Sequence, residues 1–287
     1  MRKFPDWINK KIVKNDNIER TRDILNKHRL NTVCLNANCP NIWDCFSNLT
    51  ATFMILGNNC TRNCAFCCVG HFAPEPVDKE EPLRIKKACV ELGLKYVIIT
   101  SVTRDDLPDK GAGHFQNTVQ EIKKIEGDIR IEVLVPDFNG DEESISKAAE
   151  SRPDVFSHNL ETVPRLYGKI RPGALFDRSL QVLRLASKEK LVTKSSFFVG
   201  IGETKNELLE AMKDLKSTGC DMLTIGQYLK PDKTSKDVEK YYTPEEFLEL
   251  KDLGHDIGFE VVESGPFVRS SYRAFESFKT LKSGGKK

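Results

Sequence analysis

Short apolar segments alternate with amphipathic helical segments from about residue 50 of this 287-residue chain to about residue 258. Alternation of this kind is typical of repeated βα units around a parallel sheet. The apolar runs predict six strands, at residues 51–56, 96–101, 129–136, 154–158, 192–199 and 222–225. We therefore predict an α/β fold, a partial (β/α)6 barrel of the TIM type.

The helices between the predicted strands carry clear end signals. Thr204 with Glu207, and Thr243 with Glu246, have the spacing of capping boxes. In a capping box the threonine oxygen and the glutamate three residues later bond exposed backbone amides at the start of a helix. Gly258 is placed to end the second of these helices.

The chain divides into a barrel and two extensions. We expect an N-terminal extension at residues 1–49, the barrel at 50–258, and a C-terminal extension at 259–287. In the last of these, residues 259–274 are predicted as a strand-like run followed by a polar loop, and the basic, glycine-containing tail 279–287 as a solvated flexible end. Because no Pro- or Ser-rich linker separates them, the extensions are predicted to add to the barrel.

The charge balance and the hydropathy pattern exclude several kinds of partner. The chain has 44 Lys and Arg against 42 Asp and Glu, without the concentrated basic stripe of a nucleic-acid surface. No apolar run approaches the roughly 18 residues of a membrane span, and the N-terminus lacks the apolar core of a secretory signal. We therefore expect a cytoplasmic protein with no nucleic-acid or membrane partner, whose cysteines are reduced.

One cysteine triplet, Cys60-x3-Cys64-x2-Cys67, directly follows the first predicted strand. In βα barrels the loops at the carboxyl ends of the strands form the active site. Three thiolates suit a cubane iron-sulfur cluster and leave one iron open, whereas structural zinc sites use four ligands. A thioredoxin-type redox pair of Cys64 and Cys67 is disfavoured, because Cys60 is left over and no helix starts between the two.

A second triplet, Cys34-x4-Cys39-x5-Cys45, lies before the barrel and predicts a second cluster with an open position. The remaining three cysteines fit packing better than metal binding, since none has a place in either spacing. These are Cys68, Cys89 and Cys220.

The two triplets together resemble those of a known family. Cys-x3-Cys-x2-Cys with Phe66 before the last cysteine resembles the motif of the radical S-adenosylmethionine (SAM) superfamily. The additional triplet at 34–45 resembles the lipoyl synthase family within it. The resemblance extends over nearly the whole chain, at residues 52–57, 96–102, 104–107, 131–138, 158–166, 224–229, 264–266 and 268–272.

The resemblance implies a sulfurtransferase that inserts two sulfur atoms into an octanoyl chain, which is amide-linked to a lysine of a lipoyl carrier domain. The implied cofactors are two 4Fe-4S clusters and SAM, which carry the difficult chemistry. The implied partners are octanoylated carrier domains (the glycine cleavage H protein or acyltransferase subunits of 2-oxoacid dehydrogenases), an electron donor such as ferredoxin or flavodoxin, and an iron-sulfur cluster carrier.

The family pattern also implies which residues hold each cluster. The SAM-binding cluster is implied at the triplet 60–67. The auxiliary cluster, the implied sulfur source, is expected at the triplet 34–45 with a serine of the Arg269-to-Tyr272 motif as its fourth ligand. We assign that ligand to Ser271, with Ser270 as the near alternative.

Five residues are predicted to contact SAM. Gly200 and Gly202 lie in a turn after a predicted strand, where glycine lets a ligand approach the backbone, although an ordinary βα turn explains them equally well. Asp105, Asn159 and Glu161 follow predicted strands and are expected to face the barrel mouth, although a loop salt bridge or a helix cap also explains them. His158 is interpreted as a structural histidine, because radical abstraction needs no general base.

One stretch departs from the family pattern. After Leu229 the family usually has a Pro-Ser-x-x-His-x-Pro-Val sequence, and here Ser235 stands where the histidine is expected. If this loop contacts the carrier, partner recognition is altered. Two alternatives remain open: another radical SAM sulfur-inserting enzyme, or a non-enzymatic iron-sulfur electron-transfer protein.

Overall fold

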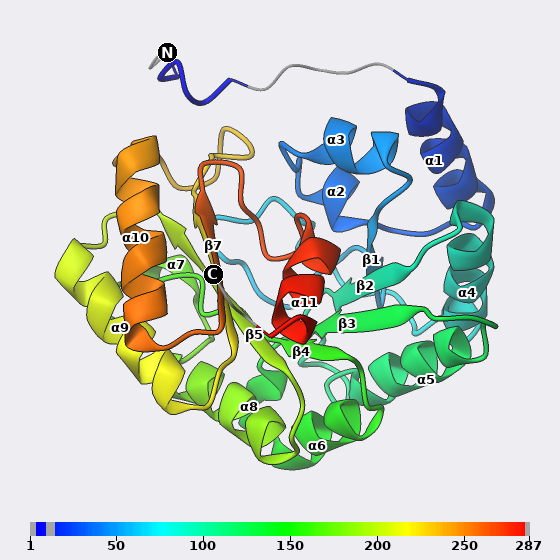
Figure 1. Cartoon of the computed structure of the whole chain (residues 1–287). Coiled ribbons are helices and arrows are strands. Elements are labelled where there is room, and N and C mark those ends of the chain that lie inside the picture. Colours follow the sequence, from blue (N-terminus) through cyan, green and yellow to red (C-terminus); the bar gives the residue numbers. More distant parts are fainter. Residues whose placement is uncertain (1–3, 10–14, 285–287) are drawn as a thin grey trace.

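Seven parallel strands form one sheet in the computed structural model, which describes residues 4–9 and 15–284. The strands follow sequence order, so that β1 and β7 form the two edges of a curved, open barrel (Figure 1). Their bounds are β1 Thr52–Ile55, β2 Tyr96–Ser101, β3 Arg130–Leu134, β4 Val155–Ser157, β5 Thr193–Val199, β6 Met222–Gln227 and β7 Val261–Gly265. The predicted α/β partial barrel is confirmed.

Helices cover the convex face of the sheet and bury its apolar side chains (Figure 1). They are α4 Glu81–Leu92, α5 Ala112–Lys123, α6 Glu142–Glu150, α8 Phe176–Lys188, α9 Lys205–Ser217 and α10 Pro244–Ile257. Both predicted capping boxes are present, at Thr204 before α9 and at Thr243 before α10. Gly258 ends α10 with φ +106°, a left-handed conformation that glycine adopts without strain.

The C-terminal segment contributes more to the fold than its sequence indicates. Residues 259–274 were expected outside the βα units, but they supply β7, which pairs in parallel with β6. The polar loop that follows leads into α11 (Ala274–Lys282), so residues 279–282 of the expected flexible tail are helical. This helix lies on the concave side of the sheet (Figure 1), where Phe275 and Phe278 pack against Tyr96 of β2 at ring distances of 5.4 and 5.8 Å.

A buried ion pair lies inside the barrel. Lys194 Nζ of β5 lies 2.9 Å from Glu132 Oε1 of β3, and both side chains are 1% exposed. Tyr96 Oη and Ser157 Oγ also donate hydrogen bonds to the Glu132 carboxylate, at 2.7 and 2.8 Å. The Glu132 carboxylate thus has hydrogen-bond partners in addition to Lys194, which a buried ion pair needs in order to offset its desolvation.

In the described part of the N-terminal segment, three helices precede the barrel: α1 Asp16–Lys27, α2 Val33–Asn36 and α3 Ile42–Ser47. The short helices α2 and α3 lie together above β1 (Figure 1); they carry Cys34 and Cys45, and Cys39 lies in the turn between them. Within the described residues, none of the helices combines the length and the apolar character needed to span a bilayer.

Candidate active site and cluster-binding segments

The second triplet, Cys60, Cys64 and Cys67, lies in the loop after β1, and all three thiols are half-buried. Backbone amides donate to two of the sulfurs: those of Arg62 and Thr103 to Cys60 Sγ at 3.4 and 3.3 Å, and that of Val69 to Cys67 Sγ at 3.4 Å. Amide hydrogen bonds to sulfur are a feature of iron-sulfur sites and tune their potentials.

Burial raises the pKa values of Cys64 and Cys67. Burial, together with the neighbouring thiols of Cys64 and Cys60, raises the pKa of Cys67 to about 12. Burial also raises the pKa of Cys64, although the nearby Arg171 guanidinium opposes the shift. Metal binding here must therefore release protons, as it does wherever thiolates are the ligands.

Arg62, inside the triplet, fixes this loop to the loops that follow β2 and β3. Its guanidinium donates to both carboxylate oxygens of Asp105 at 2.7 and 3.0 Å, and lies 2.7 Å from Asp137 Oδ1. Asp137 is fully buried; burial alone raises its pKa, but Arg62 outweighs this and holds the pKa at about 2. The spacing between Cys60 and Cys64 is thus held by a buried ion pair.

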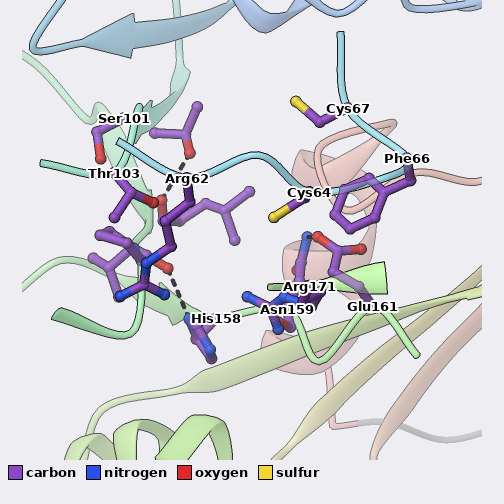
Figure 2. Close-up of a pocket in the computed structure, with 14 residues that line it drawn as sticks. Arg62, Cys64, Phe66, Cys67, Ser101, Thr103, His158, Asn159, Glu161 and Arg171 are labelled. Carbon is purple, nitrogen blue, oxygen red and sulfur yellow. Dashed lines mark hydrogen bonds between the residues drawn. The ribbon is translucent and has the colours of Figure 1, made fainter. Parts of the chain in front are cut away.

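A cavity of about 180 Å³ opens beside this triplet. Figure 2 shows Cys64 and Cys67 on one wall and Asn159, Glu161 and Arg171 facing Cys64. The cavity is lined by Arg62, Cys64, Phe66, Cys67, Thr100, Ser101, Thr103, Leu134, Val135, Pro136, His158, Asn159, Glu161 and Arg171.

Several buried polar atoms of this cavity have no hydrogen-bond partner among the described residues. They are Ser101 Oγ, His158 Nε2, Asn159 Oδ1, Glu161 Oε2 and Arg171 Nε. An unsatisfied buried polar group costs about 1–3 kcal/mol, so a cluster of them indicates a polar ligand. A zwitterionic molecule that carries a ribose, as SAM does, offers the complementary donors and acceptors.

The protonation states in the cavity follow from burial. His158 Nδ1 donates to the Val135 carbonyl at 2.8 Å, which leaves Nε2 as an acceptor, and burial lowers the His158 pKa to about 4. Burial raises the pKa of Glu161, whereas Arg171 opposes that shift. Asn159 Nδ2 donates to Glu161 Oε1 at 3.0 Å and fixes that carboxylate.

The five predicted SAM contacts are divided by the structure. Asn159 and Glu161 line the cavity, whereas Asp105, Gly200 and Gly202 do not. The Asp105 carboxylate accepts hydrogen bonds from Arg62. Packing explains the glycine at position 200, because a Cβ there would lie 2.3 Å from both Gln227 Nε2 and the Lys240 carbonyl oxygen. A SAM contact of these three residues stays a prediction.

The first triplet meets the C-terminal motif. Asn41 Nδ2 donates to the Phe267 carbonyl at 2.8 Å, and Tyr272 Oη donates to Asp44 Oδ2 at 2.7 Å. Cys45 and Ser271 line one cavity, whereas Ser270 Oγ is buried without a hydrogen-bond partner among the described residues. The segment approaches β6 closely, because Gly226 has no Cβ that would clash with the Val268 carbonyl oxygen at 2.1 Å.

In the first triplet, Cys39 and Cys45 lie close enough to Cys34 to affect the charge of its thiol. Burial raises the pKa of Cys34 strongly, and Cys39 and Cys45 raise it further. In the described part of the chain no three His, Cys, Asp or Glu side chains converge on a single-ion position. Three neighbouring thiols fit a cubane, in which each thiolate binds a different iron.

Two arginines of the site were missed by sequence reasoning. Arg62 is inside the triplet itself, so its place between two cysteines was an available signal. Arg171 follows the short helix α7 (Tyr167–Ile170), and its Nη1 donates to the carbonyls of Asn159 and Leu160 at 2.8 and 3.1 Å. Nothing local marks Arg171, since only the fold brings it beside Cys64.

Comparison with known proteins gives consistent results. Residues 54–215 match the model of the Radical SAM superfamily. The chain is 51% identical over 272 residues to a lipoyl synthase of Caldanaerobacter subterraneus subsp. tengcongensis, covering 94% of this chain and 95% of that one. It is 51% identical over 281 residues to a lipoyl synthase of Caldicellulosiruptor saccharolyticus, covering 97% of this chain and 99% of that one.

Solved structures share the fold at low sequence identity. Methylornithine synthase matches with a TM-score of 0.54 and 16% identity, over 90% of this chain and 81% of that chain. A maturase of the FeFe hydrogenase matches with a TM-score of 0.57 and 14% identity, over 94% and 79%. At these identities the two structures support the partial barrel alone.

Proposed function

The chain belongs to the lipoyl synthase family of the radical SAM superfamily, and from that premise we propose how its own residues divide the reaction. The proposed reaction inserts two sulfur atoms into an octanoyl chain on a lysine of a lipoyl carrier domain. Family membership removes the electron-transfer alternative, since lipoyl synthases are enzymes.

Cys60, Cys64 and Cys67 are the proposed ligands of the SAM-binding 4Fe-4S cluster. When bound, this cluster and SAM supply a radical that removes hydrogen from an unactivated carbon, and the auxiliary cluster supplies sulfur. The protein's contribution at this site is orientation and exclusion of water. Arg62 holds the cysteine loop, and the unpartnered atoms of Asn159, Glu161 and Arg171 are the proposed contacts of the polar end of SAM.

Cys34, Cys39 and Cys45, with Ser271, are the proposed ligands of the auxiliary 4Fe-4S cluster, and Ser270 is the alternative fourth ligand. The proposal is carried by the contact between the first triplet segment and the C-terminal motif, which the Tyr272–Asp44 hydrogen bond joins across 228 residues of sequence. Cys64 and Cys67 of the second triplet line the separate cavity of unpartnered polar atoms. A hard alkoxide ligand on a soft cluster is a weak point, which suits a cluster that gives up its sulfur.

The acyl chain needs an apolar path between the two cluster sites. Phe198 of β5 packs against Phe66 of the second triplet at 5.5 Å, and the Arg269 guanidinium lies over the Phe198 ring at 5.5 Å. Arg269 also lies close enough to Cys39 and Glu161 for both to act on its charge. We propose that Phe66 and Phe198 form the apolar wall of this path.

The loop with Ser235 is the proposed contact for the carrier domain. Its Lys236 amide donates to the Ala65 carbonyl of the second triplet at 2.7 Å, and its Pro231 carbonyl accepts from Asn38 Nδ2 of the first triplet segment at 3.3 Å. Ser235 itself is buried and donates to Asp232 Oδ1 at 2.9 Å. The serine at this position thus holds the loop's own shape.

The proposed organisation keeps three segments: residues 1–49 with the first triplet, 50–258 as the barrel, and 259–287 with the serine motif. All nine cysteines are free, which supports the proposed cytoplasmic, reducing location. An electron donor such as ferredoxin or flavodoxin and an iron-sulfur cluster carrier complete the proposed partners.

The function is tested on anaerobically reconstituted protein with a reductant, SAM and an octanoyl-lysine peptide. We expect about eight irons per chain, as two cubanes require, together with 5'-deoxyadenosine and a dithiolated peptide. Cys39→Ala should still cleave SAM but make no dithiolated peptide, whereas the matched control Cys89→Ala should behave as the parent. Lipoyl product from Cys39→Ala contradicts the assignment of the sulfur donor, and SAM cleavage without sulfur insertion by the parent indicates another radical SAM reaction.

A further inference from the structure

A second cavity lies beside Cys45 of the first triplet. It has a volume of about 530 Å³ and shares no lining residue with the cavity beside Cys64. Half-buried Cys45 and Ser271 lie at its inner end, and exposed Asn48, Lys95 and Arg273 lie at its rim. It therefore connects solvent to two of the four proposed ligands of the auxiliary cluster.

We propose that this cavity is the route by which a thiolate-ligated iron-sulfur cluster reaches the auxiliary site. The inference rests on the proposed function, in which the auxiliary cluster loses its sulfur and must be replaced. The SAM cavity is an unsuitable route, because its buried polar atoms are arranged for a different ligand. Cys34 is only 6% exposed, and half-buried Cys39 does not line this cavity, so Cys45 is the thiol that a cluster entering by this route meets first.

The charges at the rim favour an anionic donor. Lys95 and Arg273 are exposed at the rim, and Lys279 and Lys282 follow on α11, where their ammonium groups lie over Phe275 and Phe278 at 4.0 and 5.5 Å. Exposed Glu276 and half-buried Asp44, which accepts a hydrogen bond from Tyr272, balance the two cations that line the cavity, so the excess positive charge comes from Lys279 and Lys282. A 4Fe-4S core with four thiolates is a net anion, and a cationic rim raises the association rate of such a species.

Delivery by this route is a ligand exchange without electron transfer. Each cysteine of the triplet replaces one incoming thiolate on an iron, and its proton passes to the displaced thiolate, which leaves as a thiol. The hydroxyl of Ser271 replaces the fourth thiolate in the same way. Atoms and charge balance, and no oxidant or reductant is consumed.

The test measures cluster loading directly. The full chain with Cys60, Cys64 and Cys67 all changed to alanine offers only the auxiliary site, and the probe is a 4Fe-4S cluster ligated by 2-mercaptoethanol. Loading is followed by iron-thiolate absorption and counted as protein-bound iron. Lys95→Glu combined with Arg273→Glu should slow loading by about tenfold or more, within the range of electrostatic steering, and added salt should remove most of the difference. Asn48→Trp, which narrows the rim, should also slow loading.

Two controls separate the route from general damage. Lys188→Glu, an exposed charge reversal on α8, should leave the loading rate unchanged. In the complementary chain, with Cys34, Cys39 and Cys45 changed to alanine, the rim variants should load the radical site at the parental rate. If both rim variants load the auxiliary site within twofold of the parent, or slow both sites equally, the proposed route is wrong.

A second probe, a protein that carries one 4Fe-4S cluster on its own cysteines, identifies the source. Slower loading of the rim variants with either probe supports the route. If only the 2-mercaptoethanol cluster loads more slowly, the source is a free thiolate complex; if the protein-bound cluster loads more slowly, the source is a carrier protein. A parent chain that loads the auxiliary site but yields no dithiolated peptide contradicts the proposed function and leaves the route intact. The experiments therefore distinguish a failure of the proposed function from a failure of the proposed route.

Discussion

Tyr272 Oη donates a hydrogen bond to Asp44 Oδ2 at 2.7 Å and so ties the C-terminal serine motif to the helix that carries Cys45. Tyr272→Phe removes this bond and keeps the ring. Since the tyrosine is half-buried, we expect the free energy of unfolding to fall by about 1 kcal/mol and the auxiliary iron to be lost faster to a chelator. Tyr241→Phe, a half-buried tyrosine elsewhere, is the matched control. Equal iron retention in both variants contradicts a tethering role.

The two serines of the motif differ in their surroundings. Ser271 lines the cavity with Cys45, whereas Ser270 Oγ is buried without a partner among the described residues. We expect Ser271→Ala to lower the iron content from about eight to about seven per chain, and Ser270→Ala to keep the parental iron. The reverse result in the iron assay assigns the ligand to Ser270.

We expect Arg62 to make a large contribution to stability through the loop that holds Cys60, Cys64 and Cys67. Arg62→Gln leaves the fully buried Asp137 without its closest cation and should cost about 3 kcal/mol of unfolding free energy. Arg178→Gln is the matched control, because Arg178 contacts the same carboxylate at the longer distance of 3.4 Å. Denaturant unfolding of the metal-free protein checks this, and equal losses in the two variants contradict it.

The acid stability of the protein should also depend on Asp137. Although burial opposes it, Arg62 holds the Asp137 pKa at about 2, below the unfolded value of about 3.9. The stability from this group is present above pH 4 and is lost as the pH falls toward 2. Unfolding measured across that window should show a shallower acid dependence in Arg62→Gln, and an unchanged dependence contradicts the assignment.

Because His158 is buried, we expect a second pH dependence of the free energy of unfolding, at a higher pH than that of Asp137. Burial lowers its pKa to about 4, while the unfolded value is about 6.5. Between these values the unfolded chain binds a proton that the folded chain does not, so stability is present above pH 6.5 and falls by about 3 kcal/mol as the pH drops to 4. His158→Asn should remove this part of the dependence, and an identical profile in the variant shows that another group titrates.

The buried pair of Glu132 and Lys194 should behave as one unit. Lys194→Met alone leaves an uncompensated carboxylate and should cost about 3–5 kcal/mol. The double variant Glu132→Gln with Lys194→Met should cost clearly less than the sum of the two single changes, because no charge is then left buried. A double-mutant cycle by urea unfolding measures the coupling, and strict additivity contradicts it.

Local signals were enough to predict much of the fold. The predicted strand at residues 96–101 coincides with β2, and the capping boxes at Thr204 and Thr243 form as expected. These features depend on side-chain period and on residues three positions apart, which a sequence displays directly. The spacing of the two cysteine triplets belongs to the same class, since a short loop brings its own cysteines together.

Contacts between distant segments were decided by the tertiary structure. The run at 259–274 is strand-like by its sequence, but its place as a seventh strand depends on the free edge of β6, and the position of α11 depends on apolar contact with Tyr96. Arg171 reaches the cavity beside Cys64 because the segment after β4 lies against the loop of the second triplet, where the Ala65 amide donates to the Ile170 carbonyl at 2.9 Å. The sequence by itself determined the barrel, the two triplets and the family, because these follow from local pattern and motif; packing alone decided which charges are buried together, which polar atoms are left for a ligand, and which cavity opens on Cys45 and Ser271.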